Sequence, residues 1–488
     1  MKVFIAGICG TFMAGIAQLA KAGGYEVTGC DSNVYPPMST LLESERIEVY
    51  DGYNPTHLER AGINTHCDQV LIGNALSRGN PMVEAVLDRN YSYHSGPQWL
   101  HDHVLRERKV IAVAGTHGKT TTSAMLAWIL ECAGRAPGYL IGGKPGNFEQ
   151  SAALGRGEWF VIEADEYDTA FFDKRAKFVH YHPDVAVLSN LEFDHADIFD
   201  DLDQIKIQFH HLMRTIPSAG AVIVNHDDRN IADVLGMGCW SKIVPFSIHN
   251  RNCLWFADPL TQDCSRFEIY HRRQLGGRVE WNCIGQHNMQ NALAAIAAAH
   301  SVGIEVSKSC AALSTFKATA RRLQLLFSNA HVSLYDDFAH HPTAIARTID
   351  AVKSKYAKHK IIAVLELRSN TMKKGCHGDA LGQSFNNADA TFIYQPDALD
   401  WRPQTLNTKT RLRICENKAD LIGSIVRELD LSTTKNSVII CMSNGGFDDI
   451  PEALRQHLEA TPARKICPTR TLKSTYHKNF RHEYPKQN

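Results

Sequence analysis

The first thirty residues alternate between short apolar runs and a helical hydrophobic pattern. Residues 2–6 predict a strand, residues 12–22 predict a helix, and residues 26–30 predict a second strand. Gly7 and Gly10 mark the turn between the first strand and the helix. A strand–helix–strand unit of this kind is typical of half a Rossmann-type fold.

The same alternation restarts twice further along the chain. After a polar cluster at residues 106–109, strand-like runs and helical stretches again follow each other, as a parallel sheet requires. The second set has expected strands at residues 110–114, 159–163, 184–188 and 221–225 and a helix over 287–301. The third set has expected strands at residues 331–335, 361–365, 390–394 and 437–442 and helices over 342–356, 379–387 and 419–429.

This organisation predicts an α/β protein of three domains, which matches a length of 488 residues. We expect the domains to cover residues 1–107, 108–318 and 319–462. Residues 463–488 are rich in Lys and Arg and show little apolar periodicity, which predicts a solvated basic tail.

The amino-acid composition limits the kinds of molecule that this protein can be expected to bind. With 52 acidic and 52 basic residues the formal net charge is zero, so no global basic field exists to hold nucleic acid or an anionic membrane. The 13 cysteines show neither CxxC nor Cys/His metal spacing, which is typical of free thiols in a reducing compartment. No apolar stretch approaches the length of a membrane span. We therefore expect a cytoplasmic protein without nucleic-acid or membrane partners, and nothing implies a stable protein partner.

A glycine-rich polar motif separates the apolar run at 110–114 from a helix. Glycines in such a loop let backbone N–H groups surround an anion, and the helix N-terminus adds positive potential. Lys119 supplies a mobile charge and Thr120 offers a hydroxyl to Mg²⁺. The motif predicts a nucleoside triphosphate site formed by Gly115, Thr116, His117, Gly118, Lys119, Thr120 and Thr121. The alternative is a Gly/Thr-rich connection whose lysine is merely solvated.

Polar side chains also follow the next two strands of the second set. The strand at 159–163 ends in EADEYD (residues 163–168), which supplies the hard oxygen ligands that Mg²⁺ prefers. The strand ending at residue 188 is followed by SNLEFDH, which delivers His195. A solvated acidic loop and a structural histidine are the alternatives, because imidazole is an unusual ligand of Mg²⁺.

The N-terminal glycine turn does not match the dinucleotide fingerprint. GxGxxG needs glycines at Cys9 and Phe12, so an oxidoreductase is disfavoured. A nucleotide diphosphate can still lie on the helix N-terminus at Gly10 and Thr11. Asp31, at the end of the second strand, is a candidate contact for the same ligand. A tight turn without a ligand remains the alternative for all three residues.

Taken together, the motifs resemble the Mur ligase family of ATP-dependent amide-forming enzymes. Val113 stands where kinases and GTPases have the first loop glycine, and the short form GxxGKTT is similar to the loop of this family. Further motifs occur in the family's order: EADEYD, SNLEFDH, GQHNMQNALAA (285–295), ATARRLQ (318–324) and YDDFAHHPTAI (335–345).

The resemblance implies a Rossmann-like N-terminal domain, a central P-loop ATPase-type domain and a C-terminal Rossmann-like α/β domain. It also implies ATP and Mg²⁺ as cofactors. For the metal sites, it implies that Lys119 and Thr120 bind ATP and Mg²⁺ and that Glu163 ligates the metal, with Glu166 as a second candidate. It places Asn190 and His195 near a second metal. It also implies that Asn291 contacts adenine and that Arg322 and Asp337 reach ATP from the third domain.

One departure from the family pattern indicates which branch of the Mur ligases this sequence resembles. Several Mur ligases carry a carbamylated lysine after the histidine, but the aligned position here is Phe209 or His210, not Lys206. This departure and DDFAHHPT are similar to the branch that acts on UDP-N-acetylmuramate. The segment ELRSNTMKKG (366–375) is similar to members that add the tripeptide L-Ala-γ-D-Glu-meso-diaminopimelate.

That resemblance implies UDP-N-acetylmuramate and the murein tripeptide as partners. Within ELRSNTMKKG, Arg368, Ser369 and Asn370 are candidates to hold the tripeptide carboxylates, since a guanidinium can bind a carboxylate in a bidentate manner. The alternative for Arg368 is an ordinary surface charge.

We expect ATP to convert the lactyl carboxylate of the sugar nucleotide into an acyl phosphate, which the peptide amine attacks. Lys119, His195 and Arg322 are the expected catalytic residues, and the base that deprotonates the amine is not identified by the sequence. The rival enzyme is a ligase that adds free L-alanine to the same nucleotide. A P-loop NTPase switch is the rival from another class, and the third-domain motifs at Arg322 and Asp337 argue against it.

Overall fold

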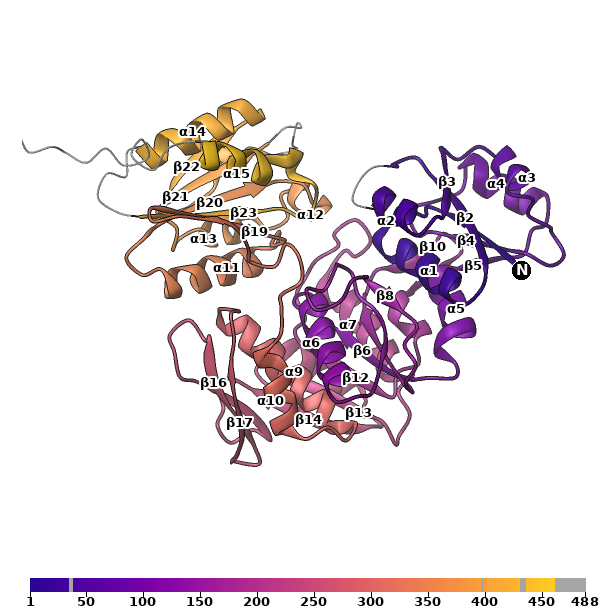
Figure 1. Cartoon of the computed structure of the whole chain (residues 1–488), viewed down its shortest axis with the longest axis horizontal. Coiled ribbons are helices and arrows are strands. Elements are labelled where there is room, and N and C mark those ends of the chain that lie inside the picture. The colour runs from indigo at the N-terminus through magenta and orange to yellow at the C-terminus, as the bar shows by residue number, and fades with distance from the viewer. Residues whose placement is uncertain (35–37, 396–398, 400, 431–435, 461–488) are drawn as a thin grey trace, which may run out of the picture.

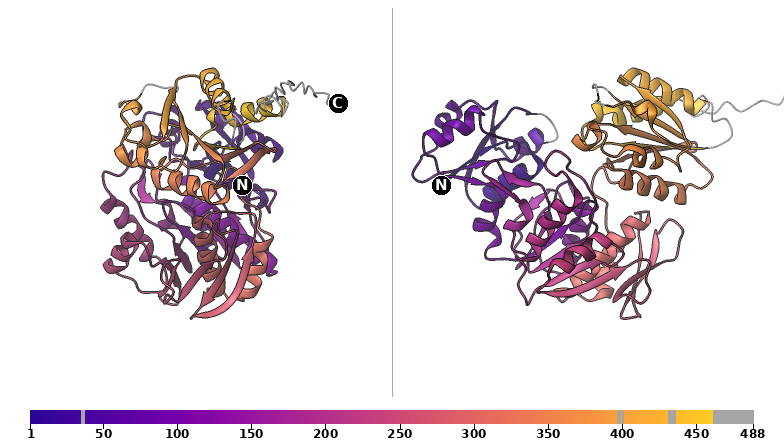
Figure 2. Two further views of the ribbon diagram at one scale, coloured as in Figure 1. Left: turned by 90° about the vertical axis from the view of Figure 1, so that its left-hand side faces the viewer. Right: turned by 180° about the vertical axis from the view of Figure 1, so that it is seen from behind.

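The computed structural model describes residues 1–34, 38–395, 399, 401–430 and 436–460. Three α/β units follow one another along the chain, and Figure 1 shows the first and third on opposite sides of the second. The right-hand view of Figure 2 shows the same arrangement from behind. The α/β class predicted from the sequence is confirmed. The expected basic tail at 463–488 lies outside the described residues.

The N-terminal unit is a parallel sheet in the order β3-β2-β1-β4-β5 with helices packed against it. Apolar side chains from β1 fill the cores on both of its faces, as expected for a central parallel strand. Its strands are β1 (Lys2–Ala6), β2 (Glu26–Asp31), β3 (Glu48–Asp51), β4 (Gln69–Ile72) and β5 (Tyr93–Ser95). Its helices are α1 (Thr11–Ala22), α2 (Met38–Ser44), α3 (Thr56–Arg60), α4 (Pro81–Asp88), α5 (Gly96–Leu100) and a π-helical turn (His101–Leu105).

The central unit is built on a ten-stranded sheet whose middle is parallel and whose two ends are antiparallel. Its strands are, in spatial order, β17 (Gln274–Glu280), β16 (Arg266–His271), β15 (Trp255–Pro259), β14 (Lys242–Ser247), β13 (Ala221–Asn225), β12 (Val185–Leu188), β6 (Lys109–Ala114), β9 (Trp159–Ala164), β7 (Gly138–Leu140) and β8 (Ala152–Ala153). A separate ribbon pairs β10 (Asp168–Ala170) with β11 (Asp173–Ala176). The helices are α6 (Lys119–Cys132), α7 (Leu202–Met213), α8 (Arg229–Met237), α9 (Gln286–Ser301), α10 (Val306–Ser314) and a 3₁₀ turn (Lys177–His180).

The C-terminal unit is a six-stranded sheet in which one edge strand runs antiparallel to the rest. Its strands are, in spatial order, β18 (Gln324–Ser328), β19 (Val332–Asp337), β23 (Ser437–Met442), β20 (Lys360–Glu366), β21 (Ala390–Tyr394) and β22 (Arg411–Cys415). Its helices are α11 (Pro342–Lys355), α12 (Asn370–Lys373), α13 (Gly378–Gln383), α14 (Lys418–Asp430), α15 (Ile450–Ala460) and 3₁₀ turns at Pro403–Thr405 and Phe447–Asp449.

One helix is shorter than the sequence pattern predicts. The helix expected over 379–387 ends at Gln383, and residues 384–387 continue as turns. Asn386 and Asn387 have low helix propensity because their side chains compete for backbone hydrogen bonds. The side chain of Asn387 instead donates to Asp350 on α11 at 2.6 Å.

The N-terminal and central units share one hydrophobic core. Helix α1 packs so closely on the central sheet that a Cβ at Gly15 would lie 2.3 Å from Cδ1 of Leu140 on β7. Buried side chains of β1, α1, β9 and α7 belong to the same cluster. In contrast, the C-terminal unit has two buried clusters of its own. Among the described residues, Ile284 is the single member of these clusters that comes from the first two units. The first joint therefore has a shared apolar core, and the second must depend on other contacts.

The parallel strands bring their carboxyl ends to one edge of the central sheet. β6, β9 and β12 are neighbours there, with Ala114 opposite both Ala164 and Leu188. The residues that follow these three strands therefore meet at this edge, where open α/β sheets bind ligands. Among the described helices, none combines the length and hydropathy that crossing a bilayer requires.

Candidate active site

The loop between β6 and α6 has the shape expected for binding phosphate. Gly118 adopts φ +81°, a left-handed conformation that disfavours other residues, and α6 begins directly after it. A Cβ at Gly118 would lie 2.5 Å from Oδ1 of Asn291, so the loop passes directly against α9. The side chain of Asn190 holds the loop from the other side, accepting from His117 N at 2.8 Å and donating to His117 O at 3.0 Å. The position of Asn291 beside the loop is compatible with its expected contact to the nucleotide.

Lys119 extends from this loop into a cluster of carboxylates. Its Nζ lies 2.8 Å from Glu166 Oε2 and 3.5 Å from Asp165 Oδ1. Burial lowers the pKa of Lys119, but the charges of Glu166 and Asp165 outweigh burial and raise it overall. Lys177 also contacts Asp165, at 3.1 Å. Lys119 is therefore charged and held among acids in the absence of a nucleotide.

His195 lies on the other side of Glu166. Its Nε2 is 3.3 Å from Glu166 Oε1, and its backbone φ is +57°, which is uncommon for a residue other than glycine. Burial lowers the pKa of His195, but the hydrogen bond and charge of Glu166, together with Asp165, raise it to about 9. Ligand atoms of Asp165, Glu166 and His195 all lie within 4.8 Å of one another. Two carboxylates and an imidazole at these separations fit a divalent cation.

A second set of oxygen ligands surrounds Thr120. Its Oγ1 lies 3.0 Å from both carboxylate oxygens of Glu163, and Glu163 also accepts from Gly142 N at 2.7 Å. Arg322, from the C-terminal unit, donates from Nη2 to Thr120 Oγ1 at 3.1 Å. Thr120 and Glu163 are thus together as expected, and His195 is paired with Glu166 instead.

Asp337 organises the segment that carries Arg322. Its carboxylate accepts from the backbone N–H groups of Leu323 and Ala339 at 2.7 and 2.9 Å and from Thr348 Oγ1 at 3.2 Å. Burial raises the pKa of Asp337 even though the charge of Arg322 opposes the shift. Asp337 therefore fixes the backbone on both sides of the β18–β19 hairpin.

These residues enclose a cavity of about 280 Å³ between the central and C-terminal units. It is lined by most of the expected nucleotide and metal residues: Thr116, His117, Gly118, Lys119, Thr120, Thr121, Glu163, Asn190, His195, Asn291, Arg322 and Asp337. Gly115 does not line the cavity; it lies against the backbone of Asn190.

Several lining residues were not assigned a role from the sequence: Asp194, His287, Asn288, Phe338, His340, Arg347 and Asn444. His287 and Asn288 lie inside the quoted GQHNMQN motif, and Phe338 and His340 lie inside DDFAHHPT. Asn444 follows the carboxyl end of β23, a position that itself signals a ligand site. Arg347 had no such signal, because it reads as an ordinary charge on α11.

The candidate residues for the sugar nucleotide lie elsewhere, at the start of α1. Gly10 and Thr11 are exposed, and no side chain caps this helix terminus, so its first N–H groups point to solvent. Asp31 is buried and already engaged, accepting from Cys9 N at 2.9 Å and from Tyr53 Oη at 3.2 Å. Asp31 thus shapes the glycine turn, whether or not it also touches a ligand.

The candidate residues for peptide binding differ in exposure and in the hydrogen bonds that they already make. Arg368 has a side chain 44% exposed and lies 3.8 Å from Glu366. Ser369 Oγ accepts from Met372 N and caps α12, and Asn370 Nδ2 donates to Asp197 of the central unit at 3.2 Å. Arg368 is therefore the one charged member of this set, and its side chain is accessible to a ligand.

The residues considered from the sequence as the counterpart of a carbamylated lysine lie on α7. Phe209 is fully buried, and His210 stacks on Trp240. Lys206 pairs with Asp203 and Asp233 at 3.3 and 2.9 Å, away from the carboxylates around His195.

Comparison with known proteins identifies the family. Family models for the Mur ligase family catalytic domain, the Mur ligase middle domain and the Mur ligase glutamate ligase domain match residues 2–108, 113–299 and 321–445. A UDP-N-acetylmuramate--L-alanyl-gamma-D-glutamyl-meso-2,6-diaminoheptandioate ligase from Escherichia coli is 50% identical over 458 residues, covering 93% of this chain and 97% of that protein. The chain belongs to the Mur ligase family. The resemblance inferred from the sequence motifs is therefore confirmed.

Two further Mur ligases are similar over nearly the whole chain. The enzyme of the same name from Haemophilus influenzae is 48% identical over 461 residues, covering 94% of this chain and 99% of its own. A crystal structure of a murein peptide ligase from Psychrobacter arcticus is 42% identical and superimposes with a TM-score of 0.72, covering 95% of this chain and all of that one.

A substitution of Gly118 tests whether the loop binds nucleotide. We expect Gly118→Ala to weaken binding of a non-hydrolysable ATP analogue about tenfold, because a side chain meets both the left-handed strain of about 1 kcal/mol and the Asn291 amide. Gly134 is a matched control at the other end of α6, with φ +73° and nothing within 4 Å of its Cβ position. Gly134→Ala should lower thermal stability yet leave the affinity measured by calorimetry unchanged. Equal affinities for the two variants would contradict the assignment.

The raised pKa of His195 predicts how stability depends on pH in metal-free protein. The folded-state value of about 9 lies above the unfolded value near 6.5, so the His195–Glu166 interaction stabilises fully below pH 6.5 and is lost as pH rises through 9. The melting temperature of the wild type relative to His195→Gln should therefore fall between pH 6.5 and 9.5 in the presence of a chelator. A difference that stays constant or grows over this range would contradict the interaction.

Proposed function

We propose that this protein is an ATP-dependent, ADP-forming ligase that joins UDP-N-acetylmuramate to L-Ala-γ-D-Glu-meso-diaminopimelate through an amide bond. The observation that carries this is the near-complete match to ligases named for this reaction, at about half identity over more than nine tenths of the chain. A phosphate loop beside carboxylates and an arginine from the C-terminal unit supports the same chemistry.

The proposed domain limits follow the three units. Residues 1–107 would hold the UDP-sugar with Gly10, Thr11 and Asp31 at the start of α1. Residues 108–318 would bind ATP, and residues 319–462 would bring the peptide, with Arg368, Ser369 and Asn370 as candidate contacts.

The proposed reaction has two steps. A lactyl carboxylate oxygen attacks the γ-phosphorus of ATP, ADP leaves, and an acyl phosphate forms; the amine of L-Ala then attacks the carbonyl carbon, and inorganic phosphate leaves. Lys119 exchanges its contacts with Glu166 and Asp165 for the phosphates, and Arg322 stabilises the charge that develops on the transferred group.

The carboxylates at the end of β9 are suited to Mg²⁺. Thr120 and Glu163 would hold one ion and Asp165, Glu166 and His195 a second, since hard oxygen ligands dominate both sets. Bound Mg²⁺ neutralises charge on the phosphate oxygens. Asn291 would contact adenine, and Asp337 positions the hairpin that delivers Arg322.

The choice of amine is tested by phosphate release. With ATP and UDP-N-acetylmuramate, we expect turnover with the tripeptide and little with free L-alanine. Turnover with L-alanine alone would favour the L-alanine ligase. Phosphate release without any amine would favour an uncoupled NTPase.

Arg322 is expected to act on the transition state. Arg322→Lys should lower kcat about 100-fold with little change in thermal stability, because a lysine lacks the planar guanidinium that now reaches Thr120. Arg321→Lys is a matched control, since Arg321 pairs with Asp336 and Ser443 O inside its own unit. Wild-type kcat for Arg322→Lys would remove Arg322 from the proposed machinery.

A further inference from the structure

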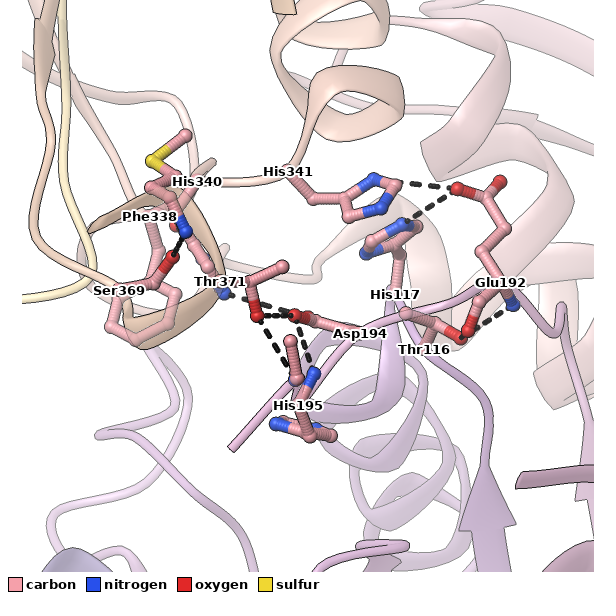
Figure 3. A network of polar contacts seen from close by, with 12 residues as sticks. Thr116, His117, Glu192, Asp194, His195, Phe338, His340, His341, Ser369 and Thr371 are labelled. Carbon is pink, nitrogen blue, oxygen red and sulfur yellow. Dashed lines mark hydrogen bonds and ion pairs between the residues drawn. The ribbon is translucent and has the colours of Figure 1, made fainter. Parts of the chain in front are cut away.

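The loop that follows β12 is held by the C-terminal unit at several points. We define residues 192–197, between Glu192 and Asp197, as the clasp loop; it carries His195. Figure 3 shows side chains of this loop facing residues of the β19–α11 connection and of α12. The inference below rests on the proposed function, because it assigns a role in assembling that same site.

Glu192 connects the phosphate loop to α11. Its Oε2 accepts from Thr343 Oγ1 at 2.6 Å and lies 3.3 Å from His341 Nδ1, both at the start of α11. The same carboxylate lies 3.3 Å from His117 Nε2, and Glu192 N donates to Thr116 Oγ1 at 2.8 Å. Figure 3 shows the two imidazoles converging on this carboxylate. One side chain thus touches the nucleotide loop and the C-terminal unit at once.

Asp194 makes a second connection, to α12. Its Oδ1 accepts from Thr371 Oγ1 at 3.0 Å and from His195 N at 2.8 Å. Thr371 Oγ1 also accepts from Ala196 N at 3.4 Å, and Lys374 Nζ donates to Ala196 O at 2.8 Å. The backbone on both sides of His195, which has a positive φ, is therefore fixed by Thr371 of α12 and by Lys374 directly after this helix.

These polar contacts carry the joint because apolar packing across it is sparse. The hydrogen bond from His117, together with the one from Thr343, lowers the pKa of Glu192 to about 2 against the effect of burial, so this carboxylate is ionised. Hydrogen bonds to an ionised acceptor are stronger than neutral ones, so each contact contributes measurably to docking.

We propose that Glu192 and Asp194 are positioning residues that couple docking of the C-terminal unit to the geometry of the phosphate loop and of His195. Docking that brings Arg322 to Thr120 also orients His117 and the His195 backbone through the clasp loop. Because coupling between two sites is reciprocal, nucleotide on the phosphate loop must in turn favour docking of α11 and α12.

A double-mutant cycle in ligation tests the Glu192 contact. Glu192→Ala and Thr343→Val should each lower kcat/KM for ATP about tenfold, and the double variant should also fall about tenfold, because both remove one shared contact. Independent roles would instead multiply to about 100-fold and overturn the proposal. Glu192→Gln retains an acceptor oxygen for Thr343 and should recover most of the loss.

Thr405→Val is the matched control in the C-terminal unit. The Thr405 hydroxyl donates to the Arg402 carbonyl within that unit, at an exposed position. Its kinetics should match the wild type. Thr371→Val removes the contact to Asp194 and releases the His195 backbone, so it should lower kcat more than it raises KM for ATP. Wild-type kinetics for both Thr343→Val and Thr371→Val would overturn the proposal.

Hydrogen–deuterium exchange tests the coupling without ligation. In the wild type, a non-hydrolysable ATP analogue should slow exchange in the phosphate loop and also at the start of α11. In Glu192→Ala and Thr343→Val, protection of the phosphate loop should remain while protection of α11 is lost. Unchanged protection of α11 would contradict the coupling, whereas failure of the wild type to ligate the tripeptide would contradict only the proposed function.

Discussion

The balance of charge at the end of β9 governs the rest of the site. Asp165 and Glu166 are adjacent in the chain and share one small volume, so both remain ionised only because cations surround them. Lys119 and Lys177 supply two of these cations, and a protonated His195 supplies the third. Any phosphate or metal ion that enters must therefore displace an existing partner. The site is organised before its ligands arrive, and binding exchanges charges without creating new ones.

The same principle distinguishes the two joints between units. The N-terminal and central units are joined by a shared apolar core, whose contacts neither water nor a charged ligand can replace. The C-terminal unit meets the central one through hydrogen bonds to ionised side chains, which water and ligands can replace. The cavity and the arginine that completes it lie at the second joint. The candidate active site thus lies at the joint whose contacts are replaceable.

Local patterns in the sequence were sufficient for the strands and for the nucleotide loop. The runs at β6, β9 and β19 are apolar and end in polar motifs, so their carboxyl ends could be placed at a sheet edge from the sequence alone. The pairing of Thr120 with Glu163 was implied by the family resemblance, and in the structure it follows from the pairing of β6 with β9. Local patterns could not give the true length of α13, which local competition by two asparagines decides.

The contacts across the second joint were beyond sequence reasoning. Glu192 meets Thr343 across 151 positions, and Asp194 meets Thr371 across 177 positions, so neither pair leaves a periodic signal. Asn190 and Ser369 were expected to touch ligands, and the structure adds a contact for each that the sequence did not predict: Asn190 holds the phosphate loop and Ser369 caps α12. Their positions in the motifs were informative, but the atoms they contact depend on the fold.

The tight packing of α1 on β7 has a consequence for what the enzyme can accept. Since Gly15 leaves no room between these elements, the distance between the start of α1 and the phosphate loop is fixed by packing. Under the proposed function, a donor substrate has to span that fixed distance with its own length. The proposed acceptor side has no such constraint, because the third unit is attached by hydrogen bonds that water and ligands can replace. Under that proposal, changes in acceptor preference would require substitutions in the C-terminal unit alone, with the packing of α1 on β7 unchanged.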